Sequence, residues 1–223
     1  MAPPTVKATA MTTSRLRLFQ LVSPALPVGA FSYSEGLEVL VQRGLLLDGA
    51  GVRAWLVAEL QRGTLALEAA SLPGLLLAEV AELRERDSWL LALREAAEVR
   101  AQQRQMGASL LGLLADLGFN PPALNLAWPA AFALAGRALG VAATELVEAY
   151  LYGWVANQLS AALRLVPLGP TEAQRLQLGL APLIAERALE LAAADPDQLW
   201  SGGVGAGLAQ LRHAELYSRL FRS

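Results

Sequence analysis

The chain has 223 residues, of which 54% are hydrophobic and 17% are charged, and its net charge is −2. This length fits one large domain, and the slightly acidic balance argues against a general nucleic-acid-binding protein and against a polybasic membrane anchor. The chain has no cysteine, one histidine (His213) and one lysine (Lys7). These counts exclude disulfides, thiolate metal sites, a metal site of several imidazoles within one chain, a P-loop and a Schiff-base lysine.

The first 13 residues are small, polar and proline-containing, and we expect residues 1–13 to form a disordered tail. Residues 15–21 have the pattern of a short helix. Arg15 and Arg17 precede an apolar run, as they would in an export signal, but Gln20 and the prolines after it interrupt that run. We therefore expect the protein to stay in the cytoplasm.

The stretch "SPALPVGAFSYSEGLE", residues 23–38, combines two prolines and a glycine with aromatic residues that look exposed. Ser32 and Glu35 have the spacing of a capping box, which predicts a helix over residues 36–42. Acidic residues in a first helical turn also complement the helix dipole, and this accounts for Glu35 and Glu38 without any catalytic role.

Apolar residues recur at helical spacing along the rest of the chain, with Gly and Pro residues between the segments. The predicted helices cover residues 52–70, 75–86, 88–117, 129–139, 144–166 and 171–193. Asp87 or Ser88 would cap the third, and Thr171 and Gln174 repeat the capping-box spacing at the last. The helix 144–166 is apolar nearly all round, so we expect it at the centre of the core.

Two further segments complete the organisation of the chain. Residues 117–136 carry no charge, but their prolines and asparagines argue against a membrane-spanning helix. The "SGGVGAG" stretch, residues 201–207, predicts a flexible hinge before a final helical segment. No segment alternates apolar and polar residues as a half-buried strand does. We predict an all-α, single-domain helical bundle with short loops over residues 14–215, followed by a C-terminal tail, residues 216–223.

The candidate catalytic residues have plainer explanations. The glycines of the 201–207 segment do not fit a dinucleotide fingerprint, because Leu208 stands where the last glycine is needed and no strand precedes them. His213 could act as a base, but a lone histidine is more often structural or exposed. We find no nucleophile–base pair, metal cluster or phosphate loop, and expect no catalytic, cofactor-binding or metal-binding residue.

An arginine-rich segment, residues 94–107, allows two interpretations. It could be a solvated helix face with ion pairs, or an exposed face that recognises acidic groups on a partner. The sequence alone does not separate the two.

The C-terminal octapeptide "LYSRLFRS" is unusual for a chain end, since frayed ends are usually small and polar. Aromatic and arginine side chains are the types most enriched at binding hot spots. The tail therefore either docks on its own core or is held for a partner. The side chains that suggest this are Tyr217, Arg219, Leu220, Phe221 and Arg222.

The two ends of the chain together resemble one family. The stretches "RLRLFQLVSPALPVGAFSYSEGLE" and "RHAELYSRLFRS" are similar to the urease accessory protein F family. Between them, "LREAAEVRAQQRQMGASLLGLL" and "LSAALRLVPLGPTEAQ" occur in the order and at the distances of that family. The resemblance covers nearly the whole chain beyond residue 14.

The resemblance implies an all-helical homodimer without catalytic activity. Such a protein would bridge urease accessory protein D, which contacts apo-urease, and accessory protein G, the GTPase that delivers nickel. It would bind no cofactor directly, since the partner proteins of the complex would handle nickel and GTP. Nucleic acid and membrane are not implied as partners. An adaptor with no P-loop lysine and a single histidine is consistent with this division of labour.

The resemblance also implies which residues contact the partners. The tail should become ordered against protein D, and Arg219 stands at the tail arginine of the family. Phe31 occupies a position where other members often carry tyrosine, and Arg164 one where they often carry lysine, in a region coupled to protein G. The residues implied for protein D are Phe31, Tyr33, Tyr217, Arg219, Leu220, Phe221 and Arg222, and the residue implied for protein G is Arg164.

Three alternatives remain at this point. An all-α transcription regulator would need a basic recognition helix, whereas the arginines here are dispersed. A small helical enzyme would act through Glu35 or His213. A protein that stimulates the GTPase would need a catalytic group, such as an arginine placed in trans, and nothing in the sequence marks one arginine for it.

Overall fold

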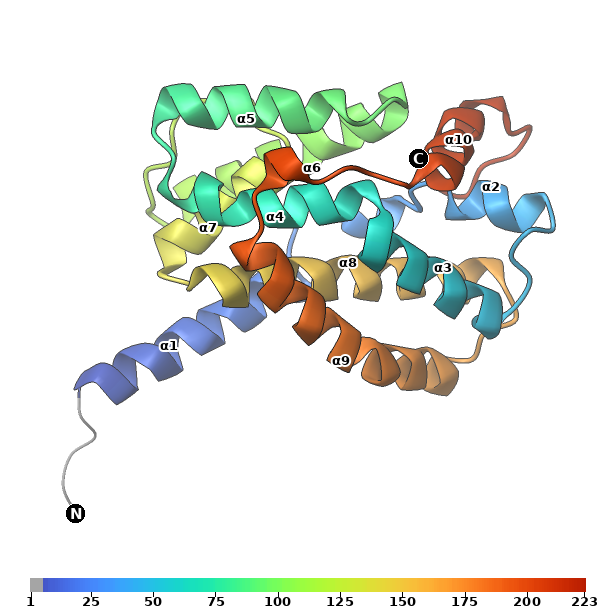
Figure 1. Ribbon diagram of the computed structural model, residues 1–223, viewed down its shortest axis with the longest axis horizontal. Coiled ribbons are helices and arrows are strands. Elements are labelled where there is room, and N and C mark those ends of the chain that lie inside the picture. Colours follow the sequence, from blue (N-terminus) through green and yellow to red (C-terminus); the bar gives the residue numbers. More distant parts are fainter. Residues whose placement is uncertain (1–5) are drawn as a thin grey trace, which may run out of the picture.

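The fold is built from helices alone over residues 6–223, the part of the chain that this computed structural model describes. This confirms the predicted all-α class (Figure 1). The longer helices are α1 (Val6–Leu21), α2 (Leu37–Gln42), α3 (Gly49–Arg62), α4 (Thr64–Leu77), α5 (Val80–Ala92), α6 (Ala97–Asp116), α7 (Trp128–Leu139), α8 (Ala143–Leu165), α9 (Pro170–Ala193) and α10 (Val204–Arg212). The short 3-10 turns are η1 (Ala30–Ser32), η2 (Pro196–Gln198) and η3 (His213–Glu215).

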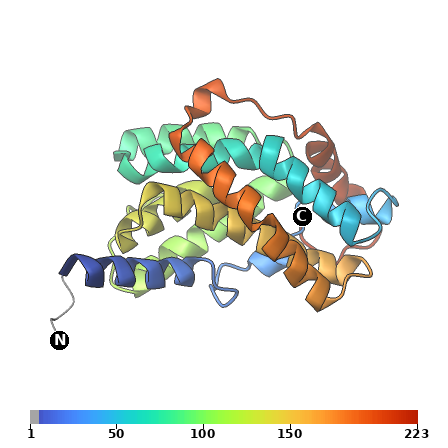
Figure 2. The same cartoon turned by 60° about the horizontal axis from the view of Figure 1, so that its bottom comes forward.

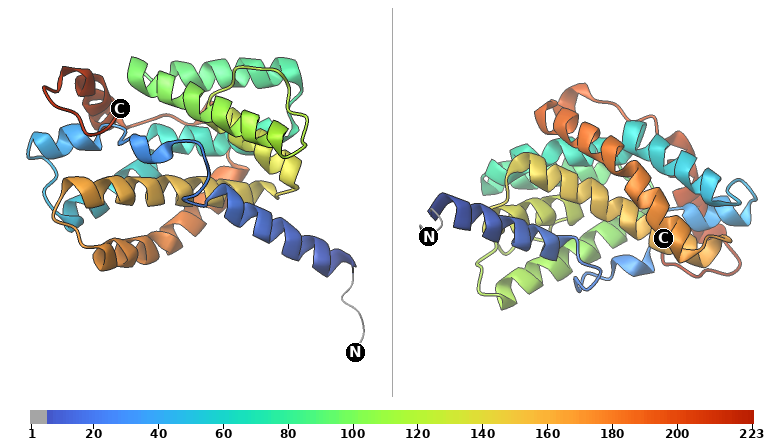
Figure 3. Two further views of the ribbon diagram at one scale, coloured as in Figure 1. Left: turned by 180° about the vertical axis from the view of Figure 1, so that it is seen from behind. Right: turned by 90° about the horizontal axis from the view of Figure 1, so that it is seen from below.

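Helix α8 lies at the centre of the bundle, where α3, α4 and α9 pack against it (Figures 1 and 3). Its central position is the one predicted from its apolar composition. It is not enclosed on every side, because Tyr152 and Leu163 remain exposed. The more completely enclosed helix is α7, in which every residue over 129–136 is buried. The core therefore lies between α4, α7 and α8.

Several helix boundaries differ from the predicted ones. The segment 52–70 is divided at Gly63, which is extended and separates α3 from α4. Pro73 does not interrupt its helix but lies inside α4, whose ten buried residues pack against α7, α8 and α9. This burial outweighs the one backbone hydrogen bond that the proline cannot make.

Asp87 does not begin a helix, although its position in the sequence suggests a cap. It lies inside α5 and is buried. Its carboxylate accepts a hydrogen bond from the Ala127 backbone N–H at 2.7 Å and forms an ion pair with Arg104 at 2.5 Å. A carboxylate that caps the start of α7 from another helix has no signature along the sequence. The long helix that was expected to start here begins instead at Ala97.

Helix α1 projects from the body of the protein (Figure 2). It begins at Val6, within residues 1–13, for which the composition predicts disorder, and residues 1–5 lie outside the described part of the chain. The helix predicted over residues 15–21 therefore begins earlier, at Val6. No Pro or Gly lies between Val6 and the helix predicted over 15–21, so that helix can extend one hydrogen bond per residue toward the N-terminus.

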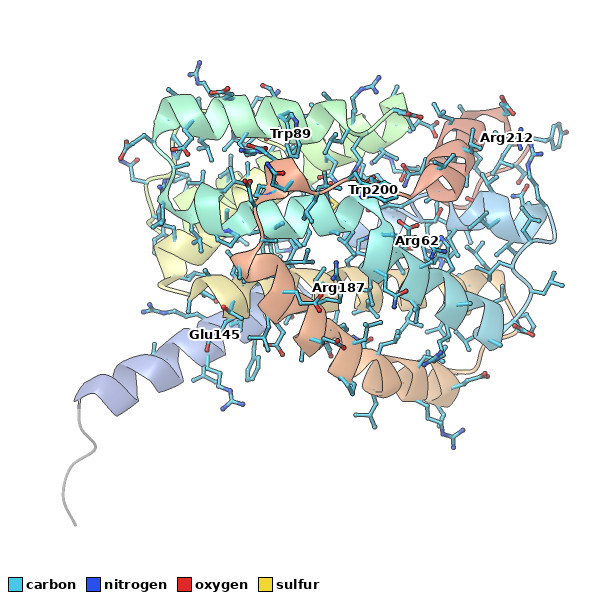
Figure 4. All side chains as sticks on the ribbon, in the orientation of Figure 1. Arg62, Trp89, Glu145, Arg187, Trp200 and Arg212 are labelled. Carbon is cyan, nitrogen blue, oxygen red and sulfur yellow. The ribbon has the colours of Figure 1, made fainter. Side chains whose placement is uncertain are left out.

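The chain after α9 crosses the molecule before its last residues pack against α2 and α6. After α9 and η2, an extended segment passes the end of α3, where Gly202 N–H donates to the Arg62 carbonyl at 2.8 Å, and Trp200 on it is exposed (Figure 4). Helix α10 begins at Val204, so half of the predicted flexible hinge is helical. It packs against α2 and α6.

Candidate functional site

The N-terminal stretch 23–38 folds as two tight turns rather than as a capped helix start. Glu35 has a positive φ of 52° and Gly36 a φ of 89°, so the chain turns sharply before α2. The Gly36 backbone also lies against α10, where an added Cβ would meet the Gln210 nitrogen at 2.9 Å. The predicted Ser32–Glu35 capping box does not form, nor does the one at Thr171, because Gly36 and Gly169 precede their helices without a side-chain cap.

Both acidic side chains of this stretch point inward. The Glu35 carboxylate accepts hydrogen bonds from Gln102 Nε2 at 2.7 Å and from Trp154 Nε1 at 3.1 Å. Glu38 is 2% exposed, and its carboxylate faces the C-terminal tail. Glu38 lies in the first turn of α2, where an acid complements the helix dipole as predicted, but both carboxylates are buried, and hydrogen-bond donors compensate for their lost hydration.

The C-terminal tail, residues 216–223, docks on this inward-facing surface. The Glu38 carboxylate accepts the backbone N–H groups of Leu220 at 2.7 Å and Phe221 at 3.0 Å. The Ser223 carbonyl accepts both the N–H and the hydroxyl of Ser34, at 3.0 and 2.7 Å. Arg222 N–H donates to the Ser32 carbonyl at 2.9 Å. Hydrogen bonds of its backbone thus hold the tail against the N-terminal turns and Glu38.

One aromatic side chain anchors the tail. Phe221 is 4% exposed and belongs to the main hydrophobic core. The guanidinium of Arg164, at the end of α8, lies over its ring at 4.5 Å from the centroid. Arg164 also donates to the Phe31 carbonyl at 3.2 Å. The residue implied for protein G thus joins the tail to the N-terminal turns.

His213, the single histidine, lies just before the tail and between two carboxylates. His213 Nδ1 is 2.6 Å from Glu98 Oε2, and Nε2 is 3.3 Å from Glu38 Oε2. Arg219 pairs with the other oxygen of Glu98 at 2.5 Å. The partners of the imidazole come from α2 and α6, and Glu215, its acidic neighbour along the chain, is not among them.

The structure brings all eight implied residues to one region but divides them by exposure. Tyr33 and Phe221 are buried in the hydrophobic core and cannot contact a partner directly. Phe31 is 69% exposed, Tyr217 is fully exposed and Leu220 is half-exposed. Arg164, Arg219 and Arg222 are exposed too, and Arg164 contacts Phe31 and Phe221. The result is an apolar and basic surface formed by both ends of the chain.

The arginine-rich segment 94–107 is not an exposed recognition face. Arg94 is buried and donates from Nε and Nη2 to Glu68 Oε1, at 2.8 and 2.5 Å. Tyr150 donates its hydroxyl to the other oxygen of Glu68 at 2.8 Å. Burial opposes the charge on Arg94, but the nearby negative charges of Glu68 and Glu35 and the hydrogen bond to Glu68 together outweigh burial and raise the pKa of Arg94. Arg104 forms its ion pair with Asp87 and is not free to contact a partner.

A cavity of about 410 Å³ opens beside the N-terminal turns. Aromatic side chains of α7 and α8 line it together with Glu35, Glu68, Gln103 and Gln177. Gln103 Oε1 and Gln177 Nε2 lack a protein hydrogen-bond partner. These unpaired amide groups in a cavity of this size suit ordered water.

Sequence reasoning missed the side chains that hold the tail, namely Ser34, Glu38, Glu98 and Gln102. Ser34 and Glu38 lie inside the N-terminal stretch that was singled out, so their roles but not their location were missed. Glu98 and Gln102 lie one helical turn apart in α6, within the arginine-rich segment. No local signal in the sequence distinguishes them from solvated residues.

Two global features of the described residues bear on chemistry. No group of three or more His, Asp or Glu side chains in this part of the chain could hold a metal ion. Within the same residues, every helix is too short or too polar to cross a bilayer.

Comparison with known proteins places the chain among a defined set of relatives. A family model described as UreF matches residues 46–181. A protein of Trichormus variabilis, named urease accessory protein UreF, is 40% identical over 93% of this chain and 95% of its own length. Relatives of the same name from Ralstonia pickettii and Prochlorococcus marinus are 40% and 35% identical, over 92% and 96% of this chain and 96% and 100% of their own lengths.

Proposed function

The chain belongs to the UreF family of urease accessory proteins, and we propose on this premise that it is a non-catalytic adaptor in urease maturation. It would bridge accessory protein D, bound to apo-urease, and the GTPase accessory protein G, which delivers nickel as cargo. The complex would work in the cytoplasm, where GTP is available. The observation that carries this proposal is the single surface formed by the N-terminal turns and the docked tail.

The exposed half of that surface has the composition of a binding site for protein D. Tyr217 and Phe31 are exposed and Leu220 is half-exposed, although a final octapeptide is ordinarily polar. Arg219 and Arg222 of the same tail are exposed as well. Aromatic and arginine side chains dominate the binding energy of protein interfaces. Such a surface is costly to leave in water and is best explained by a partner that covers it.

The binding region for protein G would begin at Arg164. This arginine is exposed at the end of α8 and touches both Phe31 and Phe221. A guanidinium there can make bidentate contacts with a carboxylate of the partner, which an ammonium at the same position could not. Because Arg164 contacts the tail, the sites for the two partners would be adjacent.

The adaptor would act by differential affinity. It would hold protein G more tightly in one nucleotide state than in another, because only such a difference can couple GTP hydrolysis to the release of nickel. The proposed homodimer would use the apolar residues that α1 and α8 leave exposed. Among them are Phe19 of α1 and Tyr152 of α8, two helices that pack against each other.

The test uses a substitution that disturbs no internal contact. Tyr217→Ala removes an aromatic ring that has no packing role in the isolated protein, and Leu189→Ala, on the exposed side of α9, is the matched control. We expect tagged protein D to recover Tyr217→Ala at least tenfold less efficiently than the wild type, as for a hot-spot residue. Leu189→Ala should be recovered normally. Equal recovery of the two variants would refute the role of the tail.

A second readout separates the partners. Arg164→Ala, assayed in the presence of protein D, should lower the capture of protein G in its GTP-bound state and the nickel content of the urease produced. Protein D should still bind. If capture of protein G is unchanged, Arg164 does not mark its binding region.

A further inference from the structure

The cavity beside the N-terminal turns is large enough for a small organic molecule. Its volume of about 410 Å³ lies within the range of small-molecule sites in proteins, which is about 300–1,000 Å³. Phe31, Leu163 and Gln174 line the cavity and are exposed, so they mark its mouth. Gln103 and Phe132 line it and are buried, so they mark its inner end. The cavity therefore extends from the surface into the protein.

One wall of the cavity is aromatic. Trp128 and Phe132 lie one helical turn apart on α7, and their ring centroids are 5.3 Å apart. Phe132 also meets the ring of Tyr150 on α8, edge to face, with 5.3 Å between the centroids. Trp154 follows one turn later on α8, and all four rings line the cavity. The faces of aromatic rings carry negative potential, so a wall of several rings favours a cation over an anion.

The charged residues of the lining are acidic. Among the described residues that line the cavity, Glu35 and Glu68 are acids and none is an arginine or a histidine. Arg94, behind the wall, pairs with Glu68 at 2.5 Å, and its charge also acts on Glu35. The Glu35 carboxylate accepts its side-chain hydrogen bonds from two uncharged groups, Gln102 and Trp154. Two buried carboxylates thus share one buried cation, which leaves a negative charge that a bound cation would compensate.

An unpaired hydrogen-bond acceptor belongs to the same lining. Gln103 of α6 is 3% exposed, and its Oε1 finds no hydrogen-bond partner among the described residues. A buried acceptor without a donor is costly, so an N–H group of a bound molecule would stabilise it. The aromatic wall, the acidic groups and this acceptor all favour the same kind of ligand, which is cationic and carries N–H donors.

We propose that this cavity binds a small, flat organic cation of the amidinium or guanidinium class. Its charge would compensate the carboxylates of Glu35 and Glu68, and its N–H groups would donate to the acidic wall and to Gln103 Oε1. Its flat body would lie against the aromatic rings. Gln177 Nε2, an unpaired donor of the lining, would hold an ordered water. The inference goes beyond the proposed adaptor function and does not depend on it, because the site lies within the isolated chain.

The experiment titrates the full-length protein with three flat molecules of nearly equal size, which are benzamidine, benzamide and benzoate. They carry a positive charge, no charge and a negative charge, so they separate the effect of charge from that of shape. Isothermal titration calorimetry at neutral pH measures the affinities. We expect benzamidine to bind at a single site per chain, benzamide to bind at least about tenfold more weakly, and benzoate to give no binding heat. Comparable affinities for all three, or no binding of benzamidine at millimolar concentrations, would overturn the proposal.

Gln103→Met places the ligand in this cavity. The substitution keeps the side-chain volume and removes an oxygen that has no protein partner, so the fold should be retained. The affinity for benzamidine should fall about tenfold, as for a lost hydrogen bond to a charged group. Gln105→Met, at an exposed position of the same helix, is the matched control and should bind as the wild type does.

Glu35→Gln tests the charge of the wall. It keeps an acceptor and removes the negative charge, so benzamidine should bind at least about tenfold more weakly, whereas the affinity for benzamide should change little. Circular dichroism checks that this variant is folded. An unchanged affinity of Gln103→Met for benzamidine would locate the ligand elsewhere and refute the site, whether or not Glu35→Gln folds.

Discussion

The guanidinium of Arg164 lies over the ring of Phe221, with 4.5 Å between the guanidinium carbon and the ring centroid. These residues are implied to serve different partners, and they are 57 positions apart in the sequence, yet they form one contact. A change in the position of the tail must therefore change the surroundings of Arg164. This contact gives a physical route by which occupation of one partner site could affect the other.

The contact between Arg164 and Phe221 can be tested in the isolated protein. Arg164→Gln removes the cation above the ring and weakens the hydrogen bond to Phe31. A cation–π contact at an exposed site is worth about 0.5–1 kcal/mol, so the hydrogen-exchange protection of the Phe221 amide should fall about two- to fivefold. Arg175→Gln, an exposed arginine of α9, is the control and should leave protection unchanged. The same protection in both variants would show that the stacking does not hold the tail.

Two aromatic residues of the tail should respond in opposite ways. Phe221→Ala empties a core position, which costs about 3–5 kcal/mol, and should release the tail to carboxypeptidase digestion. Tyr217→Ala changes a fully exposed ring and should alter stability by less than about 0.5 kcal/mol. Digestion rates of the two variants, compared with that of the wild type, measure the difference. Rapid digestion of Tyr217→Ala would mean that its ring also packs in solution.

The buried pair of Glu68 and Arg94 should show strong coupling. Arg94→Met leaves the Glu68 carboxylate with only the Tyr150 hydroxyl as a donor, and we expect the free energy of unfolding to fall by about 3–5 kcal/mol. Combining it with Glu68→Leu removes the unpaired charge and should restore most of that loss. Urea denaturation of both single variants and the double variant completes the cycle. Additive losses would contradict a mutual ion pair.

Glu59 should make stability depend on pH near neutrality. Burial raises its pKa from 4.5 to about 7, against the opposing effect of Arg94. The folded state therefore holds a proton that the unfolded state releases, and stability that is present below about pH 4.5 is lost as the pH rises through about 7. Glu59→Gln should raise the free energy of unfolding at pH 8 by up to about 3 kcal/mol and have little effect at pH 4.5.

The matched control for Glu59 is Glu186→Gln, an exposed glutamate of α9. Thermal unfolding of both variants at pH 5, 6, 7 and 8 gives the comparison. A stabilisation by Glu59→Gln that is equal at all four values would place its origin in packing and not in ionisation.

Two glycines of α6 should differ in their tolerance of a methyl group. At Gly107 an added Cβ would lie 2.1 Å from the Leu126 carbonyl oxygen, a backbone atom that cannot move aside cheaply. Gly107→Ala should therefore destabilise the protein by about 2 kcal/mol or more and separate α6 from the start of α7. At Gly112 no atom lies within 4 Å, so Gly112→Ala should stabilise by about 0.5–1 kcal/mol. Chemical denaturation distinguishes the two signs.

The helical class could be predicted from the sequence because its causes are local. The apolar spacing of α8 and the proline that stops it at Pro167 act within a few residues, as does Pro129 in the first turn of α7. The special character of the stretch 23–38 and of the tail was also visible, because their residue types are unusual for a loop and a chain end. Both stretches could therefore be singled out from the sequence alone.

The partners of those residues could not be predicted, because their contacts join distant parts of the chain. Glu38 is separated by 175 residues from His213 and by 183 from Phe221. In the sequence alone, Glu38 looks like an ordinary acid at a helix start and Arg94 looks like a surface arginine. Their partners come from other parts of the chain and are brought beside them only by tertiary folding. Local patterns determine which segments become helices, but only the packed structure decides which charges are buried, since burial depends on donors and acceptors that tertiary folding brings together.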